Sequence, residues 1–204
     1  MLASASSLRD DSEGFAMALV KEGSVDCVYN PLMYAWDVHK RYIEISGDRG
    51  AKTVMLGMNP GPHGMGQMGI PFAATSMVRD LLGISGIPVG QPSKPHPRRP
   101  VIGLDYPREE VSGTRVWGLL SDTYGESDSI FEKVFLVNHC PLMLLDGERA
   151  TNVTPDKISG PTARSLLERC DEHLVEVVRI LGACLLYTSP SPRDQRGSRM
   201  PSSA

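Results

Sequence analysis

The stretch Lys52–Pro62, KTVMLGMNPGP, decides the fold that this sequence predicts. Its first part is mostly apolar and rich in strand formers, so we expect Lys52–Met58 to form a short buried strand. The residues that follow, Asn59-Pro60-Gly61-Pro62, all favour turns and end that strand abruptly. The strand therefore leads directly into a tight loop.

A second strand with the same kind of ending is predicted over Phe131–Asn138, FEKVFLVN, and it runs into His139-Cys140-Pro141-Leu142. A third can begin at Cys184–Tyr187. Helical spacing predicts helices from Pro31, over Thr75–Leu82, over Thr114–Tyr124 and, most clearly, over Pro161–Leu181. That last helix carries one apolar stripe, formed by Leu166, Leu167, Cys170, Leu174, Val177, Val178 and Leu181.

The order of strands and helices predicts an α/β fold, with a parallel sheet covered by helices on both faces. In such sheets the ligand binds outside the carboxyl ends of the strands. Two unusual segments, residues 59–72 and 138–142, fall at that edge. The pattern therefore predicts a single cleft there.

The loop Gly57–Phe72, GMNPGPHGMGQMGIPF, combines five glycines with three prolines. Such a backbone can approach a ligand closely and remain stiff. It is neither a Walker A loop nor a GxGxxG fingerprint, because it lacks the Lys-Ser/Thr pair and the glycine spacing. A surface Ω-loop without a ligand is the structural alternative.

The composition is that of one globular domain: 204 residues, 41% hydrophobic and 22% charged. A net charge of −3 counts mildly against an extended nucleic-acid coat, although Lys94–Arg99 is a local basic patch or else an ordinary solvated loop. The four cysteines lack metal-ligand spacing, so we expect a reducing compartment and no metal. Residues 1–26 are expected to be a flexible lead with a possible short helix over Phe15–Lys21.

Several segments together resemble the single-strand-selective monofunctional uracil-DNA glycosylases. The likeness covers residues 27–183 in consistent order and is closest in GMNPGPHGMGQMGIPF, the water-activating loop of that family. It continues through YNPLMYAW (29–36), SMVRDLLGI (76–84), HPRRPVIGL (96–104), EVSGTRVWG (110–118), NHCPL (138–142) and NVTP (152–155). The resemblance implies a three-layer α/β/α fold with a central parallel sheet, incomplete at the C-terminus.

The resemblance also implies roles for particular residues. Asn59 matches the catalytic residue that orients the attacking water, and Asn138 matches the residue that reads the flipped base. Phe72 matches the aromatic side chain on which the base stacks, while Met58 and Gly61 match positions that line the pocket. Alone, Asn138 would more commonly be a turn or cap residue and Phe72 a core side chain.

The remaining implications concern partners and setting. The segment Gly147–Thr162 matches the family's DNA-contacting loop, with phosphate contacts expected from Arg149, Asn152, Thr154 and Lys157. His63 stands where the family often has an aromatic side chain, so no role is assigned to it. The family implies hydrolysis of the N-glycosidic bond of uracil and oxidised pyrimidines in single- and double-stranded DNA, starting base-excision repair. We expect a nuclear monomer without cofactor, metal or membrane contact.

The chain departs from the family at its C-terminus. The family places a His-Pro-Ser-Pro-Arg segment there, whereas this sequence has Ser189 before Pro190-Ser191-Pro192-Arg193, in a tail rich in Ser, Pro and Arg. Residues 184–204 are therefore expected to be a low-complexity, non-native tail, and residues 188–204 within it to be flexible. Two rivals follow: a DNA-binding fragment that has lost turnover, and an unrelated α/β enzyme whose loop binds a small anion.

Overall fold

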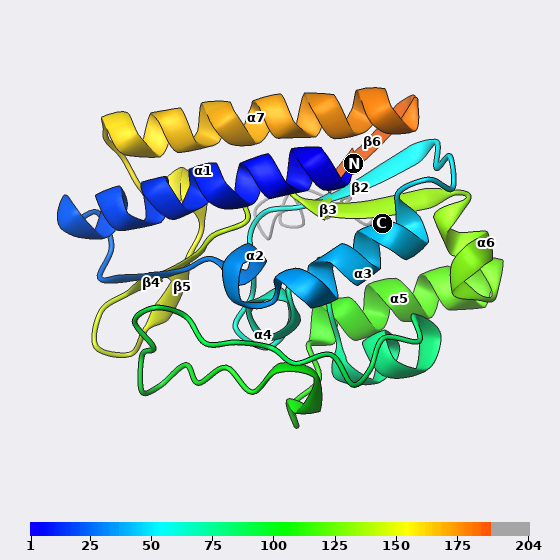
Figure 1. Ribbon diagram of the computed structural model, residues 1–204, viewed down its shortest axis with the longest axis horizontal. Helices are drawn as coiled ribbons and strands as arrows, with labels where there is room; N and C mark the ends of the chain where they lie inside the picture. The colour runs from blue at the N-terminus through cyan, green and yellow to red at the C-terminus, as the bar shows by residue number, and fades with distance from the viewer. Residues whose placement is uncertain (189–204) are drawn as a thin grey trace, which may run out of the picture.

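The computed structural model describes residues 1–188 (Figure 1). Six strands are present in this part: β1 (Cys27–Tyr29), β2 (Thr53–Gly57), β3 (Val134–Asn138), β4 (Met143–Asp146), β5 (Thr151–Val153) and β6 (Leu185–Thr188). The α-helices are α1 (Leu2–Lys21), α2 (Pro31–Tyr34), α3 (Trp36–Ser46), α4 (Met65–Met68), α5 (Val111–Tyr124), α6 (Ser127–Phe131) and α7 (Pro161–Leu181). Short turns of other helix types are η1 (Met77–Leu81), η2 (Gly103–Asp105) and η3 (Pro155–Lys157).

The predicted parallel sheet is confirmed, in the order β3-β2-β6. Strand β2 lies in the middle, with Thr53 opposite Val134 and Gly57 opposite Asn138. The third strand, predicted to begin over Cys184–Tyr187, pairs with β2 on its other side. Because both connections between parallel strands pass through helices, the fold is α/β.

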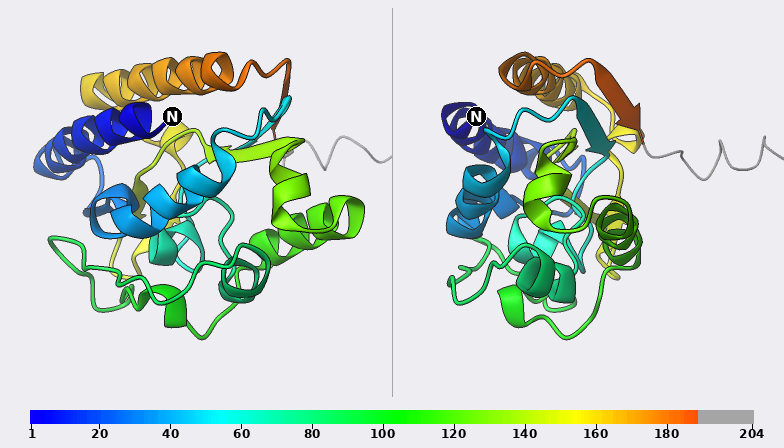
Figure 2. Two further views of the ribbon diagram at one scale, coloured as in Figure 1. Left: turned by 45° about the vertical axis from the view of Figure 1, so that its right-hand side comes forward. Right: turned by 90° about the vertical axis from the view of Figure 1, so that its right-hand side faces the viewer.

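Helices lie above and below these parallel strands. In Figures 1 and 2, α7 lies on one side of the strands and α5 on the opposite side. The main core between them contains an aromatic cluster. The centroid of the Tyr42 ring lies 5.9 Å from that of Phe131 and 5.8 Å from that of Phe135, and the ring centroids of Trp117 and Phe131 are 6.0 Å apart. This core fixes the sheet between its helices.

A second, antiparallel sheet in the order β1-β4-β5 was not predicted from the sequence. Its outer strands have only three residues each, too few to show the alternation by which a strand is recognised. Strand β4 follows the NHCPL segment, so this sheet holds the chain that leaves β3. The antiparallel sheet therefore borders the same edge as the ends of β2 and β3.

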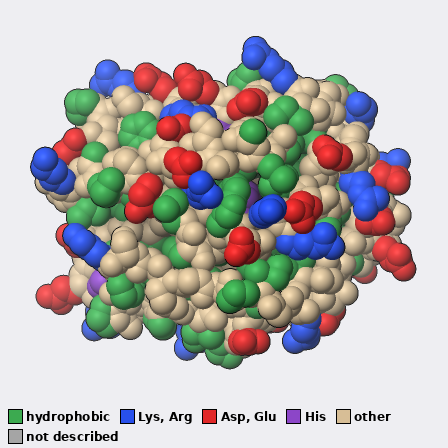
Figure 3. Space-filling model, viewed as in Figure 1, with side chains coloured by type: hydrophobic (Ala, Val, Ile, Leu, Met, Phe, Trp, Pro, Cys, Tyr) green, Lys and Arg blue, Asp and Glu red, His purple; other side chains and the backbone are tan. Residues whose placement is uncertain are grey.

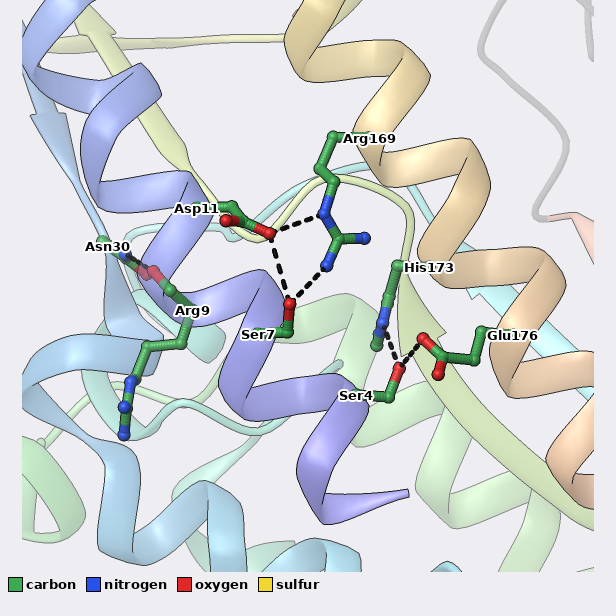
Figure 4. A network of polar contacts seen from close by, with 8 residues as sticks. All are labelled: Ser4, Ser7, Arg9, Asp11, Asn30, Arg169, His173 and Glu176. Atoms are coloured by element: carbon green, nitrogen blue, oxygen red, sulfur yellow. Dashed lines mark hydrogen bonds and ion pairs between the residues drawn. The ribbon is translucent and has the colours of Figure 1, made fainter.

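The structure does not describe residues 1–26 as a flexible lead: α1 covers Leu2–Lys21 and packs along α7 (Figure 4). The short helix expected over Phe15–Lys21 is only its last part. The prediction failed because the buried face of α1 is made largely of small or polar residues, which give a weak apolar pattern. The buried residues are Ser4, Ala5, Leu8, Ser12, Ala16 and Leu19.

Polar contacts join α1 to α7, as Figure 4 shows. The Ser4 hydroxyl donates to Glu176 Oε2 over 2.6 Å and accepts from Nδ1 of His173 at 2.9 Å. Nearer the middle of both helices, Arg169 Nε lies 2.7 Å from Asp11 Oδ2. Small residues on α1 allow this close approach, so the two helices behave as one layer.

The C-terminal part of the described chain is β6, which is exposed. Its side chains Leu185, Leu186 and Tyr187 are 60%, 48% and 50% exposed, and within residues 1–188 no strand pairs with its outer edge. The predicted tail of residues 184–204 thus begins with a strand. The flexibility predicted for the tail concerns residues that, except for Thr188, lie outside the described part.

The surface of the described chain carries mixed charge. On the face shown in Figure 3, acidic and basic side chains are interspersed, and neither sign occupies a large continuous area. No helix within residues 1–188 is long and apolar enough to cross a membrane. On this face, contact with a polyanion would therefore use local groups of basic side chains.

Two buried histidines should make stability depend on pH. Burial lowers the pKa of His39 and of His173 from an ordinary value of 6.5 to about 4. The unfolded chain takes up these protons near pH 6.5 and the folded chain only near pH 4. The contribution of the two neutral histidines to the free energy of unfolding is therefore fully present above pH 6.5, and it is lost as the pH falls from 6.5 to 4. The loss should reach about 3 kcal/mol per histidine.

Urea unfolding at several pH values measures this effect. His173→Gln should reduce the slope of unfolding free energy against pH by about one proton. Gln91→Ala, which removes no titratable group, should leave the slope unchanged. An unaltered slope in His173→Gln would show that His173 does not carry the acid sensitivity.

Candidate active site

The site is built where β2 and β3 end side by side. Beyond the last pair, Gly57 and Asn138, the two chains continue to hydrogen-bond: the amide of His139 donates to the Gly57 carbonyl and that of Cys140 to the Met58 carbonyl, both over 2.9 Å. This extra pairing holds both loops beyond the strands in a fixed register. Asn59 and Asn138 therefore lie at one edge of the sheet, as the sequence predicted.

The Asn59 amide is held through its nitrogen. Nδ2 donates to the carbonyls of Val153 at 3.2 Å and Leu142 at 3.4 Å, and it lies 3.4 Å from Oδ1 of Asn152. No described group donates to Asn59 Oδ1. The side chain is thus oriented by its donors, which leaves its carbonyl oxygen available to accept a hydrogen bond.

Asn138 is 8% exposed and lies in a narrow space beside β2. Its Nδ2 donates to the Met65 sulfur at 3.1 Å. Its Oδ1 lies directly over the Cα of Gly57, where any Cβ would overlap it. A thioether is a weak acceptor, so this amide can exchange its partner for a better one at little cost.

The Phe72 side chain reaches the same place from the end of the glycine-rich loop. A Cβ on Gly57 would lie 2.9 Å from its ring, so ring and Asn138 amide share the space that this glycine leaves open. Phe72 has a φ of 55°, which is strained for a residue with a side chain. Its carbonyl accepts a hydrogen bond from Trp117 Nε1 at 3.1 Å and lies against Gly113, which stabilises this conformation.

Met58 and Gly61, the other predicted pocket residues, lie on the loop side of the strand end. Met58 is 47% exposed. A Cβ added to Gly61 would meet nothing within 4 Å, and the φ of Gly61 is not positive. Protein packing therefore does not require glycine at this position, and the space beside it is open to a ligand.

The four residues expected to contact DNA lie on and after the β4–β5 hairpin. Asn152 joins this hairpin to the loop, because its Nδ2 donates to the Pro60 carbonyl at 3.1 Å. Thr154 follows β5 as the residue before η3, while Arg149 and Lys157 are exposed. The structure thus brings Asn152 into contact with Asn59 and leaves both basic side chains on the surface.

His63 is paired with Tyr106. Its Nδ1 lies 2.6 Å from the Tyr106 hydroxyl, and the two rings stack with centroids 5.7 Å apart. Burial lowers the pKa of His63, and the positive charges of Arg108 and Arg99 lower it further. The neutral form of the imidazole is therefore favoured at neutral pH, so His63 is not suited to act as a cation.

Sequence reasoning missed the residues that shape the site without touching a ligand. Gly57 makes room for Asn138 and Phe72, whereas Gly113 and Trp117 hold the Phe72 carbonyl. A glycine as the last residue of a buried strand is a usable signal, because it marks close approach of another group. Within residues 1–188, no three His, Cys, Asp or Glu side chains are grouped as a metal site.

The fold is α/β, and the site places two side-chain amides and an aromatic ring at the ends of two parallel strands. No family model matches the chain. The crystal structure of SMUG2 from Pedobacter heparinus superposes with a TM-score of 0.55 over 83% of this chain and 68% of that one, at 13% identity, and it supports the fold alone.

In sequence the chain is similar to the single-strand-selective monofunctional uracil-DNA glycosylases. It is 41% identical over 175 residues to the protein of that name from Bos taurus, and 39% identical to those from Mus musculus and Rattus norvegicus. The match covers 86% of this chain and 64%, 62% and 62% of those relatives. The chain therefore spans just under two thirds of their length.

The close approach at Gly57 gives a prediction about stability. Gly57→Ala should lower the free energy of unfolding by about 1–3 kcal/mol, because the new Cβ overlaps Asn138 and the Phe72 ring. Gly61→Ala is the matched control and should change stability little, since its Cβ enters open space. Equal losses in the two variants, measured by chemical denaturation, would contradict the packing described here.

Proposed function

We propose that this chain carries the base pocket of a DNA glycosylase that hydrolyses the N-glycosidic bond of uracil in DNA. One observation carries the proposal: Asn59 and Asn138 lie at the adjoining ends of β2 and β3, with the Phe72 ring beside Asn138. The similarity in sequence to single-strand-selective monofunctional uracil-DNA glycosylases supports it. We propose also that the complete fold is the three-layer α/β/α arrangement around a central parallel sheet.

Asn59 is suited to position a water rather than to deprotonate it. Its nitrogen is occupied by the carbonyls of Val153 and Leu142, so its oxygen is the group left to accept a hydrogen bond from water. A neutral amide cannot act as a general base at neutral pH. This suits a dissociative cleavage, in which the sugar already has oxocarbenium character when the water attacks.

Asn138 is suited to select uracil. One amide group can donate to uracil O4 and accept from N3–H, whereas cytosine presents an amino donor and an unprotonated nitrogen at these positions. To read a base, the amide must leave the Met65 sulfur, a partner that binds it weakly. The Phe72 ring then provides a stacking surface for the flipped base.

The DNA contacts, further substrates and cellular location that we propose are those that the resemblance to the family implies. The hairpin residues Arg149, Asn152, Thr154 and Lys157 would contact the DNA backbone around the pocket. We propose oxidised pyrimidines as further substrates, in single- and double-stranded DNA, and a role in starting base-excision repair. A nuclear location, a monomeric state and catalysis without cofactor belong to the same proposal, and size-exclusion chromatography with light scattering tests the monomer.

The role of Asn59 is tested by single-turnover excision on a uracil-containing single strand. Asn59→Ala should lower the rate by about 10²–10³, as loss of a preorganised polar group at a reacting centre typically does. Uracil-DNA binding should remain within a few-fold of the parent protein. Gln91→Ala, which removes an amide outside the site, should excise at the parent's rate. Excision by Asn59→Ala at that same rate would refute the assignment.

The role of Asn138 is tested by Asn138→Asp. A carboxylate has no donor for uracil O4 and repels it, so uracil excision should fall by about 10² or more. The readout is the ratio of excision rates for uracil and cytosine in otherwise identical strands. Retention of the parent's ratio would show that Asn138 does not read the base.

A second candidate function is a DNA-binding fragment with impaired turnover. The sequence has no histidine after His173. Pro190-Ser191-Pro192-Arg193, outside the described residues, echoes the family's His-Pro-Ser-Pro-Arg segment, but we take that echo as coincidental because too few residues separate it from α7. The missing donor would lower the rate by about 10²–10³. Grafting the family's C-terminal segment onto this chain decides between the two: a large gain in excision favours the impaired fragment, and no gain favours a chain already active.

A further inference from the structure

A hollow lined by three arginines lies beside the loop that carries Asn59. Its volume is about 280 Å³, and the side chains that matter here are His63, Gln67, Arg98, Arg99, Tyr106 and Arg108. We call it the arginine hollow. It lies next to the glycine-rich loop, because His63 and Gln67 both belong to that loop.

The three guanidinium groups have no ionic partner. Among the described residues, no carboxylate lies within 4.0 Å of Arg98, Arg99 or Arg108, although seven ion pairs are present elsewhere. The two carboxylates next along the chain are turned to backbone amides instead: Glu109 accepts from the Ser76 amide at 2.9 Å, and Glu110 accepts from the Gly113 amide. Neither carboxylate pairs with the three guanidinium groups, although the charge of Glu110 partly offsets theirs at His63.

The backbone around the arginine hollow is held in place. Gln67 Nε2 donates to the carbonyls of Pro62 at 2.9 Å and Pro100 at 3.0 Å, and its Oε1 accepts from the Ile102 amide at 2.9 Å. Tyr29 donates to the Arg99 carbonyl at 3.0 Å. Gln67 thus joins the glycine-rich loop to the segment that carries the arginines. Because the backbone is already held in place, little conformational entropy is lost when a ligand binds here.

Arg99 connects the hollow to the β4–β5 hairpin. Its Nε donates to the Ala150 carbonyl at 2.8 Å, and the exposed Arg149 is the neighbouring residue. Positive groups therefore run from Arg149 through Arg99 to Arg98 and Arg108. Burial lowers the pKa of His63, Arg108 and Arg99 lower it further, and Glu110 acts in the opposite direction, which agrees with a net positive field at this point.

We propose that the arginine hollow binds a phosphodiester of the DNA strand next to the nucleotide held in the pocket. The inference rests on the proposed function, because it takes the pocket at Asn59 and Asn138 as the place of the target base. Guanidinium groups offer planar, paired donors that match phosphate oxygens. The run from Arg149 to Arg108 passes the glycine-rich loop, which fits a continuous backbone better than a single free anion.

The test measures binding of the full chain to a single-stranded oligonucleotide without uracil, by fluorescence anisotropy over a range of salt concentrations. Arg98→Gln/Arg108→Gln should bind roughly 20-fold more weakly at about 0.1 M salt. The slope of log affinity against log salt should fall by about 1.4, since each single-strand phosphate contact contributes about 0.7. Arg164→Gln/Arg179→Gln on α7 removes the same charge from exposed helix positions and should keep the parent's slope.

Further arms separate the outcomes. Arg98→Lys/Arg108→Lys should recover most of the slope, which a merely misfolded hollow would not. Equal slopes in the two glutamine variants would overturn the proposal. The proposal would also be overturned if inorganic phosphate bound to the hollow while the glutamine substitutions at Arg98 and Arg108 left the salt slope of strand binding unchanged. The hollow would then be a small-anion site. Because this strand lacks uracil, the binding result does not depend on excision. Failure to excise uracil in the separate single-turnover experiment would count against the proposed function and leave the binding result unaffected.

Discussion

The parallel pairing of β2 with β3, and its continuation past the strand ends, is the constraint on which the rest of the site depends. Gly57 faces Asn138, and the amides of His139 and Cys140 extend the ladder onto the loop. A shift of one residue would turn every side chain of one strand to the other face. The register thus places both amides at one edge, and the loop contacts fix their orientation there.

Around that edge, each functional side chain is held by groups that have no contact with a substrate. Carbonyls from two different segments hold the Asn59 nitrogen, and the Trp117 indole holds the Phe72 carbonyl. The antiparallel sheet contributes one of those carbonyls through Val153. The second sheet is therefore part of the site's construction, which explains why it borders the ends of the parallel strands.

Much of this arrangement could be predicted from the sequence, for identifiable reasons. Strands β2 and β3 and helix α7 show strong apolar patterns, and their ends are marked by turn formers. Helix α1 could not be recognised because Ser4 and Ser12 occupy buried positions and are satisfied or enclosed only through tertiary packing. The short strands β1 and β5 are too brief to have a period. The role of Gly57 depends on what lies across from it, which a single sequence does not record.

The left-handed backbone of Phe72 has a consequence for how this protein can change. A φ of 55° favours glycine, and a residue with a side chain costs about 1 kcal/mol there. The Phe72 ring also packs against the main core, so a glycine here would relieve the strained backbone and remove that packing at the same time. Backbone preference and side-chain burial therefore act in opposite directions at this one residue, and its conformation is maintained by its surroundings rather than by its own preference.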